Sequence, residues 1–259
     1  MGSSQLIYGY LWRDDRARSH SFEELLAMAS LWAQGIRRHG NYSGDIALLT
    51  NVPSEIRIPG LATVPFDATA FPARNSRITL GWSAVPYGDY DQLLRLDLDM
   101  MAVGDVGPLF ATDDRFRVAP SDLRIMDRRH AQMLVSPWKL IGYAATGRWN
   151  TLGVSSCAYS SRGRDFAAHH TILAETTARL ARRAPGRGLH EQMYFNYLYL
   201  TGELQMQPYE RTQVQHRDHR LTPDAAIFHY PNVSERSSKM QAAMELAGRV
   251  PVAGRSFAK

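Results

Sequence analysis

Two aspartates separated by one residue, Asp97 and Asp99, follow directly after the apolar run 93–96. In an extended chain, residues i and i+2 point to the same side, so both carboxylates would face one site. Two like charges this close repel each other unless a cation lies beside them, and Mn²⁺ or Mg²⁺ prefers oxygen ligands. The pair therefore favours a metal that also binds a diphosphate.

Chance alone accounts for one such pair. The chain holds 16 aspartates in 259 residues, and random placement of that composition gives about one Asp-x-Asp. The chain has two, and the other, at Asp89 and Asp91, lies among loop-forming residues before the apolar run. Asp97 and Asp99 instead end a predicted strand, at the edge where α/β sheets bind ligands.

The elements that must position this pair follow an α/β order. A strand over 5–12, a helix from about Ser21 to Arg38 with Ser21 as its N-cap, and a strand over 46–50 open a βαβ unit. Further apolar patterns predict strands at 61–64, 93–96, 148–156 and 225–230, and helices at 167–183, 190–200 and 235–247. We expect one α/β domain over residues 1–259.

The segments YDQLLRLDLD at 90–99 and GDVGPLF at 104–110 form one block around the pair. This block resembles one found in nucleotide-sugar glycosyltransferases of the A-type fold, and most of all the retaining family 8, which contains glycogenin and bacterial lipopolysaccharide galactosyltransferases. The resemblance implies a Rossmann-like, mostly parallel sheet. It also implies a nucleotide-binding half over about 1–110, an acceptor-binding half over about 111–250, and a tail at 251–259.

The resemblance also implies a third metal ligand. The late segment IFHY at 227–230 is similar to the strand whose histidine completes the metal site, which assigns the metal, Mn²⁺ or Mg²⁺, to Asp97, Asp99 and His229. Asp97 would share the ion or hold the ribose. Taken without the aspartates, His229 is better explained as a hydrogen-bonded, partly buried histidine.

A second segment would supply the catalytic groups. EQMYFN at 191–196 resembles the segment whose side chain lies below the reacting sugar carbon, which makes Gln192 or Glu191 the support of an oxocarbenium-like centre and implies retention. An acidic first helix turn is the alternative explanation and needs no substrate.

The remaining implied contacts concern the nucleotide and the acceptor. Tyr8, Gly9 and Tyr10 end the first strand, where an aromatic ring could stack on uracil or could simply pack. Arg77 and Lys239 are assigned to the nucleotide or its diphosphate. The segment NTLGV at 150–154 resembles a strand beside the acceptor pocket.

Composition excludes several classes of protein. Cys157 is the only cysteine, so neither an internal disulfide nor a multi-thiolate zinc site can form, and we expect a small buried hydrophobe. No segment approaches the roughly 18 apolar residues needed to span a bilayer, and no signal peptide is evident, which favours a soluble cytoplasmic protein. His169 and His170 are expected at the surface.

The net charge of +5 and the isoelectric point of about 9.4 suit a phosphate-bearing partner. The arginines are scattered, however, and no nucleic-acid-binding stripe is predicted. We therefore expect a UDP-sugar donor and a small-molecule or glycan acceptor, with the oligomeric state open. Two alternatives remain: a metal-dependent nucleotidyltransferase or phosphohydrolase, which would show a third acidic ligand, and a basic module that binds nucleic acid or membrane.

Overall fold

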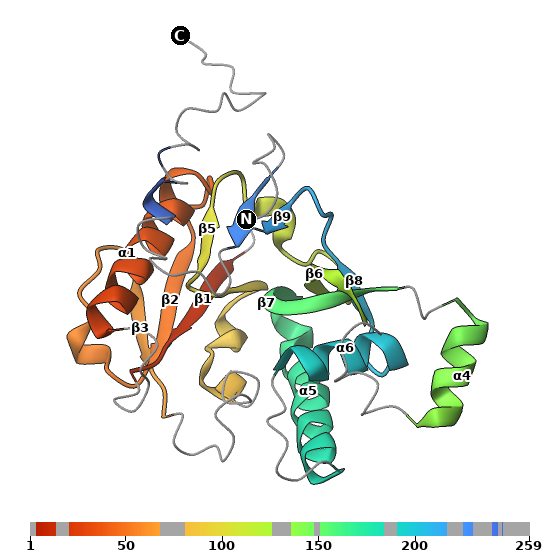
Figure 1. Ribbon diagram of the computed structural model, residues 1–259. Coiled ribbons are helices and arrows are strands. Elements are labelled where there is room, and N and C mark those ends of the chain that lie inside the picture. The colour runs from red at the N-terminus through yellow and green to blue at the C-terminus, as the bar shows by residue number, and fades with distance from the viewer. Residues whose placement is uncertain are drawn as a thin grey trace.

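The computed structural model describes residues 4–13, 21–67, 81–125, 136–147, 151–183, 191–216, 225–229, 240–242 and 245. Within these residues the chain forms a seven-stranded sheet, a smaller three-stranded sheet, and helices packed around them (Figure 1). The α/β class predicted from the sequence is confirmed.

The large sheet has the strand order β3-β2-β1-β4-β7-β6-β8. All its neighbouring pairs are parallel except the two made by β7, so β7 alone runs against the other described strands of this sheet. The sheet is therefore mostly parallel, as expected. Its strands are β1 (Gln5–Leu11), β2 (Asp45–Thr50), β3 (Ala62–Pro65), β4 (Gln92–Leu96), β6 (Phe116–Arg124), β7 (Leu152–Arg162) and β8 (Met206–Pro208).

Helices lie against both faces of the sheet. Helix α1 begins where the Ser21 hydroxyl accepts the N–H of Glu24 at 3.1 Å, which confirms the predicted N-cap. Among the described residues, no helix combines the length and the apolarity needed to cross a membrane. The helices are α1 (Phe22–Arg38), α4 (Pro137–Ala145), α5 (Gly163–Arg183) and α6 (Glu191–Thr201), with short 3₁₀ turns at Pro53–Glu55, Gly81–Ala84, Tyr87–Asp89 and Gly107–Leu109.

The strand period divides the core into two layers. Alternate residues of β1 point to opposite faces, so Ile7 packs with α1 while Tyr8 packs with α5 and α6. Leu94 and Leu93 of β4 divide in the same way. Because both faces are covered, the central strands are apolar throughout, which is why they read as continuous hydrophobic runs.

The small sheet positions the C-terminal part of the chain beside β4. It has the order β5-β10-β9, with β5 at Met100–Ala102, β9 at Val214–His216 and β10 at Ile227–His229. Strand β10 pairs antiparallel with β5, so that His229 lies opposite Met100. This register brings a histidine from the end of the described chain next to the residue that follows Asp99.

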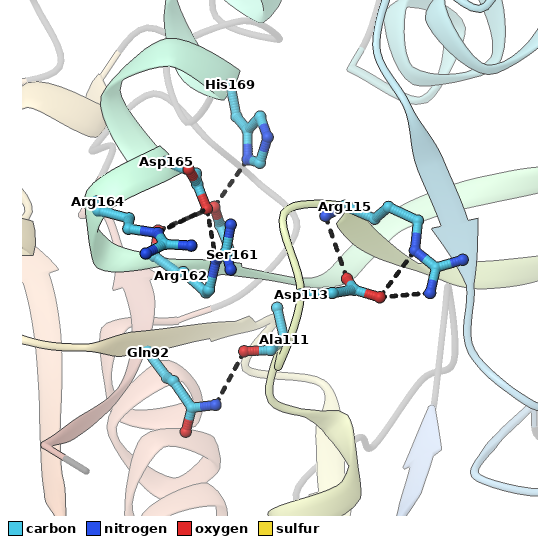
Figure 2. Close-up of polar contacts among 9 residues, drawn as sticks. All are labelled: Gln92, Ala111, Asp113, Arg115, Ser161, Arg162, Arg164, Asp165 and His169. Carbon is cyan, nitrogen blue, oxygen red and sulfur yellow. Dashed lines mark hydrogen bonds and ion pairs between the residues drawn. The ribbon is translucent and has the colours of Figure 1, made fainter.

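A polar network closes the other end of the β4–β7 pair (Figure 2). Gln92, the first residue of β4, donates from Nε2 to the carbonyl of Ala111 at 2.8 Å. Arg162, the last residue of β7, donates from Nε to Asp165 at 2.6 Å. The contact of Arg162 joins the end of β7 to the first turn of α5, and both contacts lie at the end of these strands opposite to the aspartate pair.

Several predicted boundaries need correction. Strand β7 starts later and continues to Arg162 rather than ending at 156, and α5 begins at Gly163 rather than 167. Strand β6 and helix α4 were not predicted, because the prolines and polar residues within 116–147 obscure their periodicity. Of the helix predicted at 235–247 the structure describes only 240–242 and 245, which are helical.

Candidate functional site

Two aspartates and a histidine meet at the carboxyl end of β4. Asp97, Asp99 and His229 each offer one ligand atom, and these atoms all lie within 4.8 Å of one another. The Nε2 atom of His229 is 3.5 Å from Oδ1 of Asp99. The N–H of Asp97 donates to the carbonyl of Cys157 at 2.9 Å, which fixes the chain just after β4. The structure thus brings together the three residues that the sequence resemblance assigned to a metal.

The donor set fits a hard divalent cation. Two carboxylates and an imidazole are ligands that Mn²⁺ and Mg²⁺ accept, and the group comes from the turn between β4 and β5 and from the end of β10. Without a metal, the neighbouring side chains of Arg95 and His229 offset the negative charge of the two carboxylates. The pKa shifts of Asp97 and His229 reflect these contacts.

Burial, together with the charge of Asp99, raises the pKa of Asp97 to about 7 against the opposing effect of Arg95. Burial lowers the pKa of His229, but its contacts with Cys157 and Asp99 outweigh burial and raise that pKa to about 11. These contacts favour the protonated imidazole in the metal-free protein. It must lose its proton before it can bind a metal.

Arg95 is the second cation of the site, and the sequence analysis missed it. Its side chain is 1% exposed and forms an ion pair with Oδ1 of Asp97. It also donates to the carbonyl of Ser156, and its guanidinium lies 5.4 Å from the ring centre of Tyr159. The available signal was an arginine inside the apolar run 93–96, two positions before Asp97 and so on the same side of the strand.

The first turn of α6 lies near this group. The charge of Glu191 raises the pKa of Asp97, so the two carboxyl groups are electrostatic neighbours. Gln192 donates from Nε2 to the carbonyl of Val154 at 3.4 Å, which leaves the amide oxygen as its acceptor atom. Both residues assigned to catalysis therefore start a helix that packs on β7 beside the aspartates.

Asn196 fixes that helix to the sheet. Its Oδ1 accepts the N–H of Val154 at 2.9 Å, and its Nδ2 donates to the carbonyl of the same residue at 2.9 Å. The Nδ2 also donates to the carbonyl of Gln192 at 2.7 Å. Asn196 is buried, and this double contact makes it the anchor of α6; the sequence motif contained it but gave it no role.

The three residues of the first strand that were assigned to the nucleotide differ in their surroundings. Tyr8 is fully buried and its hydroxyl bonds that of Tyr159 at 3.4 Å, so its ring has no exposed face for a base. Gly9 is required by packing, because a Cβ there would lie 3.0 Å from the carbonyl oxygen of Leu96. Tyr10 is partly exposed, and its hydroxyl is buried without a hydrogen-bond partner among the described residues.

Three other sequence-based assignments cannot be placed. Arg77 and Lys239, assigned to the diphosphate, and Asn150, near the acceptor strand, lie outside the described residues.

Two residues have different surroundings from those expected. Cys157 is buried as predicted, but its side chain contacts His229. His170 is fully buried rather than on the surface, and its ring stacks on Phe166 with centroids 3.9 Å apart. Its neighbour His169 is partly buried and bonds Ser161 at 2.8 Å. His169 and His170 lie on the side of helix α5 that covers the sheet, which explains why neither is fully exposed.

The chain is similar to known proteins in its fold, whereas its sequence gives no match to a family model or a curated protein. A crystal structure of the galactosyltransferase LgtC in complex with donor and acceptor sugar analogues superposes with a TM-score of 0.59 at 12% identity, covering 97% of this chain and 98% of that one. A structure of an active-site glutamine-to-glutamate mutant of LgtC gives a TM-score of 0.61 at 12% identity, covering 95% and 97%.

The chain has the glycosyltransferase A-type fold. Coverage of nearly the whole of both chains means that the A-type fold includes the large sheet, which leads into the aspartates, the small sheet, which carries His229, and helix α6. The fold expected from the sequence resemblance is confirmed.

Proposed function

We propose that this chain is a metal-dependent glycosyltransferase that moves a hexose from a nucleoside diphosphate sugar, UDP-linked, to an acceptor hydroxyl with retention of configuration. The observation that carries the proposal is the group formed by Asp97, Asp99 and His229 at the carboxyl end of β4 in an A-type fold. The third member of that group is an imidazole. A nucleotidyltransferase or phosphohydrolase was expected to use a third carboxylate there.

Asp99 and His229 would hold Mn²⁺ or Mg²⁺, because they face each other at 3.5 Å and neither is the partner of Arg95. When bound, the ion would neutralise the negative charge that develops on the departing diphosphate. Asp97 would share the ion or hold the ribose through the oxygen that Arg95 does not bind. His229 would give up its proton as the ion enters.

Tyr10 would contact the nucleotide. Its unpaired hydroxyl is a buried polar atom that a ribose or base could satisfy, and its ring lies 6.0 Å from the guanidinium of Arg95. In this proposal Arg77 and Lys239 contact the diphosphate, while Tyr8 and Gly9 shape the strand behind it. The nucleotide would bind in the half of the chain over about 1–110.

Gln192 and Glu191 would act on the sugar. The amide of Gln192 is held by β7 so that its oxygen can face a carbon bearing partial positive charge, and the carboxylate of Glu191 adds negative potential at the same place. The mutated active-site residue in one LgtC structure is also a glutamine. The acceptor would bind in the half over about 111–250, with attack on the face that the diphosphate leaves.

A thermal-shift screen of UDP-, GDP- and ADP-sugars, with Mn²⁺ or with a chelator, tests this proposal. A ligand that binds only the native state raises the unfolding temperature. We expect a UDP-sugar to raise it in Mn²⁺ and to have little effect in chelator, and the stabilising sugar then to be transferred or slowly hydrolysed. Equal stabilisation by UDP-sugar with and without metal would contradict a metal-dependent donor site.

A further inference from the structure

Helix α4 exposes its largest apolar side chains. Trp138 is 82% exposed and Ile141 is 61% exposed, and no residue of the helix is buried. Leu140 and Tyr143 are the residues of α4 that contact the core, so Trp138 and Ile141, which are three positions apart, share the opposite side. In Figure 1, α4 projects from the edge of the molecule beside α6. An exposed tryptophan and isoleucine on one ridge mark an interaction surface.

The sequence around α4 is entirely basic in its charge. Between residues 128 and 148 there is no aspartate or glutamate. The same segment carries the basic residues Arg128, Arg129, Lys139 and Arg148, of which the structure describes Lys139.

The last turn of helix α5 adds positive charge to the region around α4. Burial opposes the lowering of the pKa of Glu203 by Arg179 and Tyr197, to which Lys139 adds a small part. Burial raises the pKa of Tyr197, and Arg183, at the end of α5, slightly opposes that rise. Because Tyr197 donates to Glu203 at 3.0 Å, Lys139 and Arg183 are both within electrostatic reach of one bonded pair. The carboxylate of Glu203 is itself bound by Arg179. The region around α4 thus combines the exposed apolar side chains of Trp138 and Ile141 with the basic residues Lys139 and Arg183.

We propose that α4 docks on an anionic lipid surface, with Trp138 and Ile141 in the interfacial layer and Lys139 and Arg183 at the headgroups. Tryptophan favours the membrane interface, and basic residues near it are attracted to acidic lipids. A second copy of this chain fits less well, because the basic residues near α4 of the two copies would repel each other. A nucleic acid would leave the apolar ridge uncovered. The docking is independent of the proposed transferase activity.

Co-sedimentation of the full chain with vesicles tests this docking. One vesicle is phosphatidylcholine alone, and the other contains about one-third phosphatidylglycerol. We expect binding to the anionic vesicle only. The double variant W138S/I141S should bind at least about tenfold more weakly, since it removes the inserted side chains. Both residues are exposed, so its unfolding temperature should match that of the unmodified protein.

Charge variants distinguish the effect of the basic residues near α4 from the effect of the protein's net charge. K139Q/R183Q and the control R13Q/R115Q each remove two positive charges and bring the formal charge from +5 to +3. Arg13 and Arg115 are 40% and 48% exposed and pair with Glu55 and Asp113, away from α4. We expect weaker binding for K139Q/R183Q than for the control.

Three results would overturn the proposal. The first is equal binding to both vesicles, and the second is undiminished binding by W138S/I141S. The third is a dimer in light scattering that W138S/I141S converts to monomer, because it would assign the ridge to self-association.

Discussion

Arg95 and Asp97, two residues apart on β4 and the turn after it, form an ion pair beside the candidate metal ligands. The guanidinium also donates to the carbonyl of Ser156, so one buried arginine connects the aspartate to the neighbouring strand β7. The positive charge of Arg95 offsets part of the repulsion between the carboxylates of Asp97 and Asp99. The pairing engages one oxygen of Asp97 and leaves Asp99 facing His229.

Arg95→Met should lower the free energy of unfolding by about 2 to 4 kcal/mol, because it leaves the carboxylate of Asp97 and the carbonyl of Ser156 without their buried donor. Urea unfolding followed by circular dichroism measures the change. Removing both members of the ion pair, in R95M/D97N, should recover part of the loss.

Arg115→Met is the matched control, since Arg115 pairs with Asp113 at the surface. Exposed ion pairs contribute little, so its unfolding midpoint should not change measurably. If R95M and R115M unfold at the same urea concentration, Arg95 does not have the structural role described.

Asn196→Ala should destabilise the protein by about 2 to 4 kcal/mol, because the N–H of Val154 loses the side chain that accepts it and the carbonyl of Val154 keeps only the longer contact with Gln192. The start of α6 should also shift, with a fall in turnover that exceeds the change in donor affinity. Calorimetry of unfolding and donor titration measure the two effects. A variant as stable as the unmodified chain would show that α6 is anchored by other contacts.

Gln192→Ala should reduce kcat by about a hundredfold while the KM for the donor changes little, since its amide oxygen would act only as the sugar carbon gains charge. Gln34→Ala is the control, because Gln34 bonds Ser30 within α1. A raised KM with unchanged kcat would assign Gln192 to ground-state binding instead.

His170 should make the fold acid-sensitive. Burial lowers its pKa to about 3, so below the unfolded pKa of about 6.5 only the unfolded chain takes up this proton. Stability from this residue is therefore complete above that pH and falls by about 1.4 kcal/mol per pH unit below it, down to about pH 3. Between pH 7 and pH 5 the unmodified protein should lose about 2 kcal/mol more than His170→Gln. Equal losses would show that His170 takes up its proton in the folded state.

The fold was predictable where local patterns are strong. The N-cap at Ser21, the helix of α1 and the central strands β1, β2 and β4 match their predicted ranges within about two residues. Strands such as β8 and β9 are three residues long and exist through pairing with distant partners, so no local period marks them. Helix α4 was missed because prolines and polar residues obscure its periodicity, and because Trp138 and Ile141 are exposed although their type predicts burial.

The site was predictable only through spacing and resemblance. Asp97 and Asp99 were predicted to end a strand and instead lie in the turn after β4, but they are only two residues apart, so their proximity still follows from the sequence. The proximity of His229 depends on the β5–β10 register, which joins segments more than 120 residues apart. Arg95 as the ionic partner of Asp97 had a local signal in its spacing that the sequence analysis did not use. Cys157 as a neighbour of His229 could not be inferred, because that contact depends on how β7 and β10 meet.

Direct titration of Mn²⁺ into the full chain with UDP present, followed by the electron paramagnetic resonance signal of the free ion, is the decisive measurement. The unmodified protein and the surface control Asp113→Asn should bind one ion with equal affinity. Asp99→Asn and His229→Asn should each bind about a hundredfold more weakly, provided that both variants keep the native circular dichroism spectrum. Unchanged Mn²⁺ affinity in both folded variants would contradict the assignment of the metal to this group.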